Sequence, residues 1–298
     1  MKTPNKSLKI ALIGTRGVPA NYGGFETCVE EIGKRLFEKG HDVTVYCRKS
    51  YYREKNEKYL GMKLVHLPNI EKKSLDTMSH TLLSALHALF NPCDIYMVFN
   101  AANSLFIFPL RLFGRKILIN TDGLEWERSK WGFWGKSFYK ISEKIACLIA
   151  NRLVSDSNGI KEYYKKKHKT DSSKIAYGAY IQHVNKPERL LGLGLKPGEY
   201  FLQITRFEPE NHPLLTIQAF NRLNTDKKLV LVGGNPYQNY YTKKIDSEAS
   251  NNVILPGFIY DQDLLKELWC FSFAYIHGNN VGGTNPALLQ AMASACFT

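Results

Sequence analysis

Two glycine-rich stretches have the composition of loops that bind phosphate groups. The first, Gly14–Gly24 (GTRGVPANYGG), follows an apolar run and leads into a helical pattern, and the second, His277–Pro286 (HGNNVGGTNP), does the same near the end of the chain. Backbone amides at a helix N-terminus can approach a phosphate closely, and the helix dipole favours negative charge there. For the first stretch taken alone, a flexible loop without a ligand is the alternative.

The first stretch differs from the loop of a nicotinamide-dependent dehydrogenase. It lacks the G-x-G-x-x-G spacing, and the second predicted strand ends in Cys47-Arg48-Lys49. An NAD enzyme would place an acidic residue there to bind the ribose. A dehydrogenase is therefore disfavoured.

Acidic, aromatic and basic side chains are concentrated directly after a predicted strand at 116–120. The stretch TDGLEWERSKW contains Asp122, Glu125, Trp126 and Arg128. Ligands of open α/β sheets bind at the carboxyl ends of the strands, so these side chains could hold sugar hydroxyls against an aromatic ring. The alternative is structural: Asp122 and Glu125 cap the turn, and Trp126 fills the core.

Further polar loops follow predicted strands in the second half of the chain. Arg206 lies in the stretch RFEPEN, where its guanidinium could offset the charge of a diphosphate. His277 opens the second glycine-rich stretch and joins Asp122 and Glu125 as a candidate catalytic residue. Asp261-Gln-Asp263 has the D-x-D spacing of a cation site, but it opens a helical pattern, which favours an N-cap. No metal site is predicted.

Short apolar runs alternate with amphipathic helical stretches, a pattern typical of parallel sheets covered by helices on both faces. A polar, then glycine- and proline-rich stretch near 181–199 separates two halves. We therefore predict an α/β protein of two Rossmann-like, doubly wound domains, at 1–185 and 199–298. Helices are expected at 25–39, 213–223, 261–269 and 286–295. The expected strands are 9–14, 42–47, 63–67, 94–99, 116–120, 152–155, 174–177, 201–205, 228–232, 253–255 and 271–276.

The chain has 298 residues and a formal net charge of +13, which favours polyanionic partners such as a phosphorylated substrate, a membrane surface or nucleic acid. The basic run 161–169 comes without a helix-turn-helix, zinc-finger or RNA-recognition signature, so nucleic acid is not expected. The six cysteines have no C-x-x-C spacing, which predicts neither zinc nor disulfides. Because the sequence has no secretory signal and no apolar span, a cytoplasmic protein is expected.

Taken together, these motifs resemble those of the retaining glycosyltransferases of the GT-B fold, family 4, and within it the rhamnosyltransferase-like branch of bacterial capsule and surface-polysaccharide synthesis. The matching stretches are ALIGTRGVPANYGGFET, TDGLEWERSKW, RFEPEN, LVGG and HGNNVGGTNPALLQAM, spread over almost the whole chain. The resemblance implies transfer of a sugar from a nucleotide sugar, with dTDP-rhamnose as the expected donor, to a lipid-linked oligosaccharide acceptor. It implies no cofactor and no essential metal.

The resemblance also implies roles for individual residues. Asp122 and Glu125 would face the acceptor or the donor sugar, and Arg206 would offset charge on the leaving phosphate. Glycine-loop amides would bind the donor diphosphate from both domains. The residues expected around the donor are Gly23, Gly24, Arg206, Asn211, Gly283, Thr284, Asn285 and Gln290.

Two departures from the family pattern bear on activity. Relatives usually carry a glutamate at the position of Gln290, where it holds the ribose hydroxyls, and an uncharged amide should bind the donor more weakly. Relatives also continue beyond the position of Thr298, so the second domain is expected to be incomplete. A degenerate sugar-nucleotide-binding protein without turnover is therefore the rival to an active enzyme.

A lipid-linked acceptor has to be met at a bilayer, which leads us to expect peripheral attachment at the inner face of the cell membrane. The lysines of 161–169 would contact anionic lipids, while Trp131, Phe133 and Trp134 would lie at the headgroup level. The alternative is that these three aromatic residues pack in the core.

Overall fold

The computed structural model describes residues 6–20, 23–72, 75–128, 131–235 and 238–298. Contacts within the chain divide it into two compact units. The first comprises Met1–Glu127 and Trp131–Ala176, and the second comprises Tyr177–Thr298 together with Arg128–Lys130.

The chain enters the second unit at Tyr177, before the stretch 181–199 at which the sequence suggested a boundary. Gln182 is already bound to that unit, because its backbone amide donates to the carbonyl of Ala293 over 3.1 Å. Its carbonyl in turn accepts from the thiol of Cys270. These contacts attach the connecting segment to the second unit.

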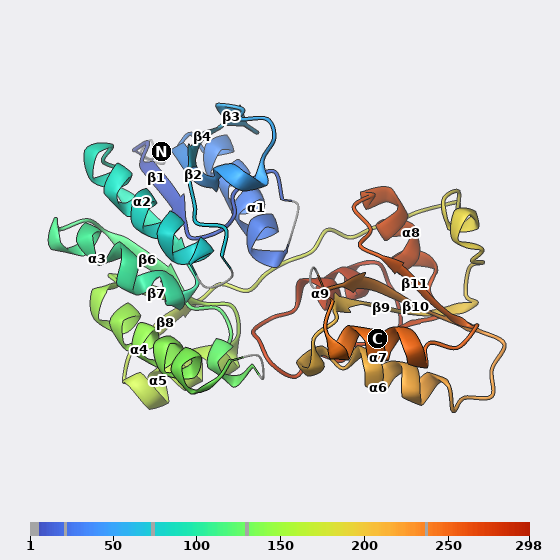
Figure 1. The fold of residues 1–298 in the computed structure, drawn as a ribbon. Helices are drawn as coiled ribbons and strands as arrows, with labels where there is room; N and C mark the ends of the chain where they lie inside the picture. The colour runs from blue at the N-terminus through green and yellow to red at the C-terminus, as the bar shows by residue number, and fades with distance from the viewer. Residues whose placement is uncertain (1–5, 21–22, 73–74, 129–130, 236–237) are drawn as a thin grey trace. The chain divides into compact units, whose positions relative to one another are not determined.

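The first unit is built on an eight-stranded sheet in the order β3-β4-β2-β1-β5-β6-β7-β8 (Figure 1). Every pairing is parallel except that of β3 with β4, which is antiparallel. Apart from β8, the parallel strands are short and rich in Val, Ile and Leu, as buried strands covered on both faces are. The strands are β1 Lys9–Ile13, β2 Asp42–Arg48, β3 Lys58–Tyr59, β4 Met62–Leu67, β5 Ile95–Phe99, β6 Ile117–Asn120, β7 Arg152–Ser155 and β8 Ser172–Lys174.

Helices cover both faces of this sheet. Helix α1 (Gly24–Glu38) lies against one face, where Gly33 is packed close to Met62 and Leu12. The other helices cover the opposite face, and their inward side chains join the strands in one core that includes Ala11 and Ile13. They are α2 Asp76–Phe90, α3 Ser104–Leu112, α4 Phe133–Ile149 and α5 Asn158–His168.

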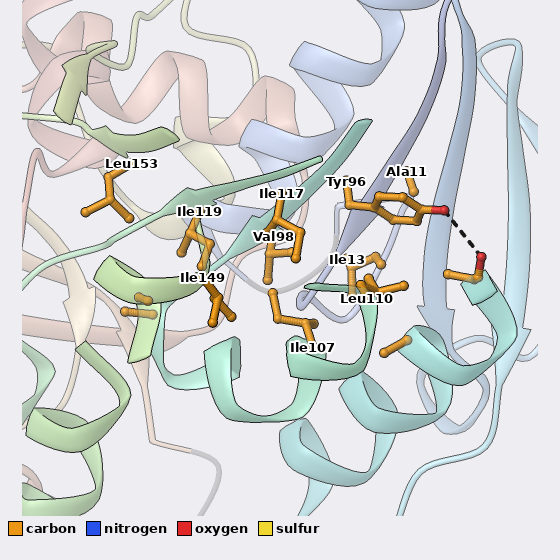
Figure 2. Close-up of a cluster of buried hydrophobic side chains, with 14 of the residues drawn as sticks. Ala11, Ile13, Tyr96, Val98, Ile107, Leu110, Ile117, Ile119, Ile149 and Leu153 are labelled. Carbon is orange, nitrogen blue, oxygen red and sulfur yellow. Dashed lines mark hydrogen bonds between the residues drawn. The ribbon is translucent and has the colours of Figure 1, made fainter. Parts of the chain in front are cut away.

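Figure 2 shows how this core is assembled. Ile107 and Leu110 of α3 and Ile149 of α4 point toward the strands, where they meet Val98 and Ile119. The hydroxyl of Tyr96, drawn with a dashed line, donates to the carbonyl of Ala88 in α2 over 3.3 Å, so the buried phenol keeps a partner.

The second unit repeats the design on a smaller scale, with a parallel four-stranded sheet in the order β11-β10-β9-β12. Alternate residues of β10 belong to two separate cores, because Val230 packs with α8 and α9 while Leu229 packs with α6 and α7. The elements are β9 Tyr200–Arg206, α6 Pro213–Phe220, β10 Lys228–Gly234, α7 Tyr240–Glu248, β11 Val253–Gly257, α8 Gln262–Phe271, β12 Ala274–Tyr275 and α9 Pro286–Ala293.

The predicted α/β class with parallel, doubly wound sheets is confirmed, and two strand predictions were wrong in extent. A strand was expected at 174–177, but β8 ends at Lys174. The expected strand 271–276 shrinks to β12, because the amphipathic pattern of α8 continues through Phe271. The N-cap role of Asp261 is confirmed: its carboxylate accepts from the backbone amides of Asp263 and Leu264.

Candidate functional site

In each sheet, a predicted glycine-rich loop follows a strand beside a change in winding direction, and the loop with Asp122 follows β6, one strand further along. In the first unit the chain steps outward from β1 through β2 to β4 and then returns to β5 on the other side of β1. In the second unit it steps from β9 through β10 to β11 and returns to β12 beside β9. Ligands of open α/β sheets bind at the carboxyl ends of strands beside such a switch point.

The glycine-rich loop after β1 is closed by carboxylates from α1. Glu26, which is buried in the first turn of the helix, accepts from the backbone amide of Arg16 over 3.1 Å. Glu30, one turn further along, accepts from the amide of Ala20 over 2.8 Å. Two loop amides that could have faced a phosphate are therefore bonded to side chains of the protein itself. Asn21 and Tyr22 of this loop lie outside the described residues.

Gly23 and Gly24 lie at the beginning of α1. Gly23 is the N-cap residue, with extended backbone angles and no side-chain cap, and Gly24 is the first helical residue. The position matches the expected helix N-terminus. Glu26 nearby complements the helix dipole with the protein's own negative charge.

A buried amide joins the strands on the two sides of the switch point in the first unit. Nδ2 of Asn103 donates to the carbonyl of Phe99 over 2.7 Å and to that of Gly14 over 3.2 Å. Its Oδ1 accepts from the hydroxyl of Thr81 over 2.8 Å. A side chain at Gly14 would not fit, because a Cβ there would lie 2.6 Å from the carbonyl oxygen of Phe99.

Asp122 is held in an uncommon backbone conformation at the end of β6. Its φ is 59°, and that of Asn100 at the end of β5 is 73°, both in the left-handed region. Nδ2 of Asn100 donates to the Asp122 carboxylate over 3.2 Å, and Oδ1 of Asn120 accepts from the Asp122 amide. Strained backbone held by its surroundings is common at functional sites.

Glu125 and Trp126 follow Asp122 in the same loop. The carboxylate of Glu125 accepts from the indole nitrogen of Trp131 over 3.3 Å. The ring of Trp126 is half-buried and contacted by two ammonium groups, those of Lys140 at 4.6 Å and Lys167 at 4.8 Å from its centroid. Trp126 is therefore not a core residue, and the alternative that it fills the core was wrong. Ser129 and Lys130 lie outside the described residues.

In the second unit, the loops after β9 and β12 are bonded directly to each other. Nδ2 of Asn279 donates to Oδ1 of the buried Asn211 over 2.9 Å, and the amide of Asn280 donates to the Glu210 carbonyl. Nδ1 of His212 donates to the carbonyl of Gly278 over 2.7 Å. These neutral hydrogen bonds fix two loops, from opposite sides of the switch point, as one surface.

Close backbone approach makes this arrangement possible. A Cβ at Gly278 would lie 2.5 Å from the carbonyl oxygen of Asn211 and 3.0 Å from Nε2 of Gln203. Gln203 is buried in the middle of β9, and its Nε2 donates to the same Asn211 carbonyl over 3.1 Å. The Asn211 side chain completes the link by donating to the carbonyl of Arg206 over 2.9 Å.

Two predicted site residues, Arg206 and His277, are exposed on this surface. Arg206 is the exposed last residue of β9, and His277 is the exposed residue two positions after β12. Desolvation lowers the pKa of His277 below its usual value, which favours the neutral imidazole near pH 7. The pair combines a permanent cation with a neutral ring that can accept or donate a proton.

The amides at the beginning of α9 are partly used by the helix cap. Oδ1 of Asn285 accepts from the amides of Ala287 and Leu288, over 2.9 and 3.3 Å. Donors for a ligand therefore have to come from the loop before the cap, where Gly283 and Thr284 lie half-buried. Their proposed contact with a phosphate stays a prediction.

Gln290 lies inside α9 and is bonded to the segment that enters the second unit. Its Nε2 donates to the carbonyl of Tyr180 over 3.4 Å. A glutamate cannot donate this bond, so the amide has a structural role that the sequence pattern did not suggest.

Several residues of these surfaces were missed by sequence reasoning, and they are Asn100, Asn103, Gln203, His212 and Asn279. Gln203 had a readable signal, because a polar residue in the middle of the apolar run FLQIT needs a buried partner. The others are loop or helix-end residues whose partners lie on different strands, so only the folded chain identifies them.

Comparison with known protein families and curated proteins gives one family and one short relative. Residues 7–180, more than half of the chain, match the family described as Domain of unknown function (DUF1972), and the chain belongs to this family. A curated protein of Klebsiella pneumoniae, the uncharacterized 42.6 kDa protein in the cps region, is 34% identical over 61 residues. That match spans 20% of this chain and only 16% of the relative.

Solved structures match over nearly the whole chain. Sucrose-phosphate synthase from Thermosynechococcus elongatus is 17% identical with a TM-score of 0.80, over 97% of this chain and 79% of that one. The HepE protein of Anabaena, in complex with UDP and glucose, is 14% identical with a TM-score of 0.74 over the same shares. These likenesses confirm the predicted GT-B fold.

Proposed function

We propose that this protein is a glycosyltransferase that uses a nucleoside-diphosphate sugar. The observation that carries the proposal is the surface at the switch point of the second unit, where hydrogen bonds between the loops after β9 and β12 present Arg206 and His277 outward. Departure of a nucleoside diphosphate builds negative charge, and a fixed guanidinium with preorganised amides stabilises such charge. The HepE structure, which contains UDP and glucose on the same fold, supports this chemistry.

In this proposal each unit supplies a different part of the reaction. Arg206 and the amides of Gly283 and Thr284 bind the diphosphate, so that no divalent cation is required. Asp122, whose carboxylate is oriented by Asn100, binds hydroxyl groups of a sugar, with Glu125 beside it. His277 in its neutral form accepts or donates hydrogen bonds at the reacting sugar.

The finer assignment is transfer of L-rhamnose from dTDP-rhamnose, with retention, to a lipid-linked glycan during capsule or surface-polysaccharide synthesis. It rests on the family 4 motif resemblance, and the relative from a cps region supports the pathway class. UDP-glucose is the donor against which dTDP-rhamnose is to be compared.

Calorimetric titration with dTDP and UDP in the presence of EDTA tests the binding step. We expect binding without added metal, and a loss of about ten- to a hundredfold in affinity for Arg206→Ala, the range for losing a hydrogen bond to a charged group. Arg222→Ala, which removes another exposed arginine of the second unit, is the matched control and should leave the affinity unchanged. Binding that disappears with EDTA, or that Arg206→Ala leaves intact, would contradict the proposal.

Gln290 favours a second candidate, a sugar-nucleotide-binding protein without turnover, because it replaces the charged ligand that the family resemblance implies. An assay with radiolabelled dTDP-rhamnose and a lipid-linked acceptor separates the two. Transfer of label supports the enzyme, whereas nucleotide binding without transfer or hydrolysis supports the binding protein.

A further inference from the structure

Three neighbouring helices of the first unit expose large apolar side chains on the face that points away from the sheet. In α4, Trp134, Ile141 and Leu148 follow one another at intervals of seven residues, so they share one side of the helix. Trp134 is 82% exposed and Leu148 is 78% exposed. The core-facing side of the same helix is formed by other residues, such as Ile149 (Figure 2).

Helices α2 and α3 continue this pattern. Leu82, Leu86 and Phe90 of α2 recur every four residues and are exposed, Phe90 by 85%. Their counterparts on α3 and just after it are Leu105, Phe108, Leu112 and Phe113, all exposed. Ile107 and Leu110 of the same helix point into the core instead (Figure 2).

The three stripes adjoin one another, since α2 packs against α3 and α3 against α4 (Figure 1). We call this surface the α2–α4 face and define it by the exposed apolar residues of the three helices with Phe113. Scattered exposed apolar residues are normal on proteins, but a continuous apolar surface marks a contact with a membrane or another protein.

The charges on these helices have one sign where they are exposed. Arg111, Lys140 and Lys144 are exposed, whereas the carboxylates are withdrawn. Asp76 is half-buried and pairs with Arg48 over 2.7 Å, and Glu143 is buried and accepts from the hydroxyl of Tyr163. Among the described residues of α2, α3 and α4, no carboxylate is exposed.

We propose that the α2–α4 face docks on the surface of an anionic lipid bilayer. Apolar and aromatic residues would enter the headgroup region, and the exposed cations would contact lipid phosphates, which is how amphipathic helices bind at an interface. None of the described helices is long and apolar enough to cross a membrane. The cation-only charge favours an anionic bilayer over a second copy of this basic chain.

The inference depends on the helices alone and not on the sugar chemistry, so its failure would leave the proposed function standing. It also differs from the expectation drawn from the basic run 161–169. That run is on α5, where Lys165, Lys166 and Lys167 are exposed without accompanying large apolar side chains.

Flotation with vesicles tests the proposal, using phosphatidylcholine alone and an equal mixture of phosphatidylcholine and phosphatidylglycerol. The full chain should float with the mixed vesicles and much less with phosphatidylcholine. Trp134→Ser combined with Leu148→Ser should lower the partition coefficient at least about tenfold, because two large apolar groups no longer enter the interface. Lys140→Glu combined with Lys144→Glu should lower it by a similar factor.

Matched controls are available on other surfaces. Tyr240→Ser changes an equally exposed aromatic residue on α7, and Lys165→Glu with Lys166→Glu makes the same charge change on α5. Both should keep flotation close to that of the unchanged chain. Loss of flotation in the α5 variant with none in the α4 variants would overturn the assignment. So would a dimer, measured by light scattering, that Trp134→Ser dissociates, since a second copy would then cover the face.

Discussion

The two units hold their carboxyl-edge loops with different chemistry. In the first, charged groups bond the loops: Glu26 and Glu30 accept from loop amides, and the buried Arg48 pairs with Asp76. In the second, the loops after β9 and β12 are joined by neutral groups, the amides of Asn211 and Asn279 and the imidazole of His212 with their partners. The carboxylate of Glu208 there accepts from the side chain of Asn235 after β10 and not from a backbone amide. Both edges thus carry carboxylates, but those of Glu26 and Glu30 occupy backbone amides of the glycine-rich loop, whereas Glu208 binds a side-chain amide and Arg206 is exposed.

This difference shows why a glycine-rich sequence alone does not identify a phosphate site. A loop amide is available to a phosphate only if no side chain of the protein has already bonded to it. After β1, two such amides are occupied by carboxylates, and an incoming anion would also meet their negative charge. We therefore expect the second unit to provide most of the binding energy for a diphosphate.

The largest effect is expected from Gly233→Ala, which tests how tightly the edge of the second unit is built. Gly233 has a φ of 130°, and a Cβ there would lie 1.9 Å from the backbone carbonyl oxygen of Thr205. Strand β10 would have to move away from β9, just before Arg206. We expect a loss of at least about 4 kcal/mol in the free energy of unfolding of this unit, measured by urea denaturation.

Gly257→Ala is the control for that substitution. Gly257 also has a positive φ, 76°, but a Cβ there would meet nothing within 4 Å. Only the backbone strain remains, which costs roughly 1–2 kcal/mol. Hydrogen exchange should show lost protection in the second unit and intact protection in the first. Equal costs for the two substitutions would mean that the close approach to Thr205 is not what holds this edge.

The fold could be predicted in most of its strands because buried parallel strands are marked by short apolar runs. The expected 42–47 and 228–232 correspond to Asp42–Arg48 and Lys228–Gly234. Where the pattern was ambiguous, as at 271–276, the amphipathic period of α8 extended the helix into the expected strand. The order of strands in the sheet, and hence the switch points, depends on contacts between distant segments that no local pattern records.

The candidate site was predictable only to the level of loops. Arg206, Asn211 and His277 were predicted because each follows an apolar strand, and the structure brings their loops together. Their holding partners were not recognised, since the contact of Asn211 with Asn279 joins residues 68 positions apart. For Phe133 and Trp134, the alternative that placed these aromatic residues in the core was wrong, because both are exposed.

A smaller effect is expected from acid, which should weaken the first unit before the second. His80 is fully buried beside Arg48, and burial together with that positive charge lowers its pKa from 6.5 to about 4. The unfolded chain therefore binds a proton below pH 6.5 that the folded chain binds only near pH 4. The free energy of unfolding is therefore not reduced by this group above pH 6.5, and it falls by up to about 3 kcal/mol as the pH drops to 4.

Urea denaturation across this pH range, with His80→Gln as the matched variant, checks the assignment. The variant cannot take up the proton, so its unfolding free energy should fall less steeply between pH 6.5 and 4. Hydrogen exchange at pH 5 should show the first unit losing protection while the second keeps it. Parallel pH profiles for the two proteins would show that His80 does not cause the acid sensitivity.

The smallest effect is expected from Gln290→Glu, where the family pattern and the structure predict opposite consequences. The pattern predicts tighter donor binding, because a carboxylate bonds to ribose hydroxyls more strongly than an amide does. The structure predicts a stability loss, because Nε2 of Gln290 donates to the Tyr180 carbonyl and a carboxylate would instead repel that oxygen. The bond is long, 3.4 Å, so the loss should be only about 1 kcal/mol.

Gln290→Ala removes the donor without adding charge and should cost a similar amount of stability with no gain in affinity. Calorimetry with dTDP and urea denaturation of the three proteins distinguish the contributions. If Gln290→Glu binds no more tightly than Gln290→Ala, this position does not contact the donor, and the amide serves only to hold the segment at Tyr180 on α9.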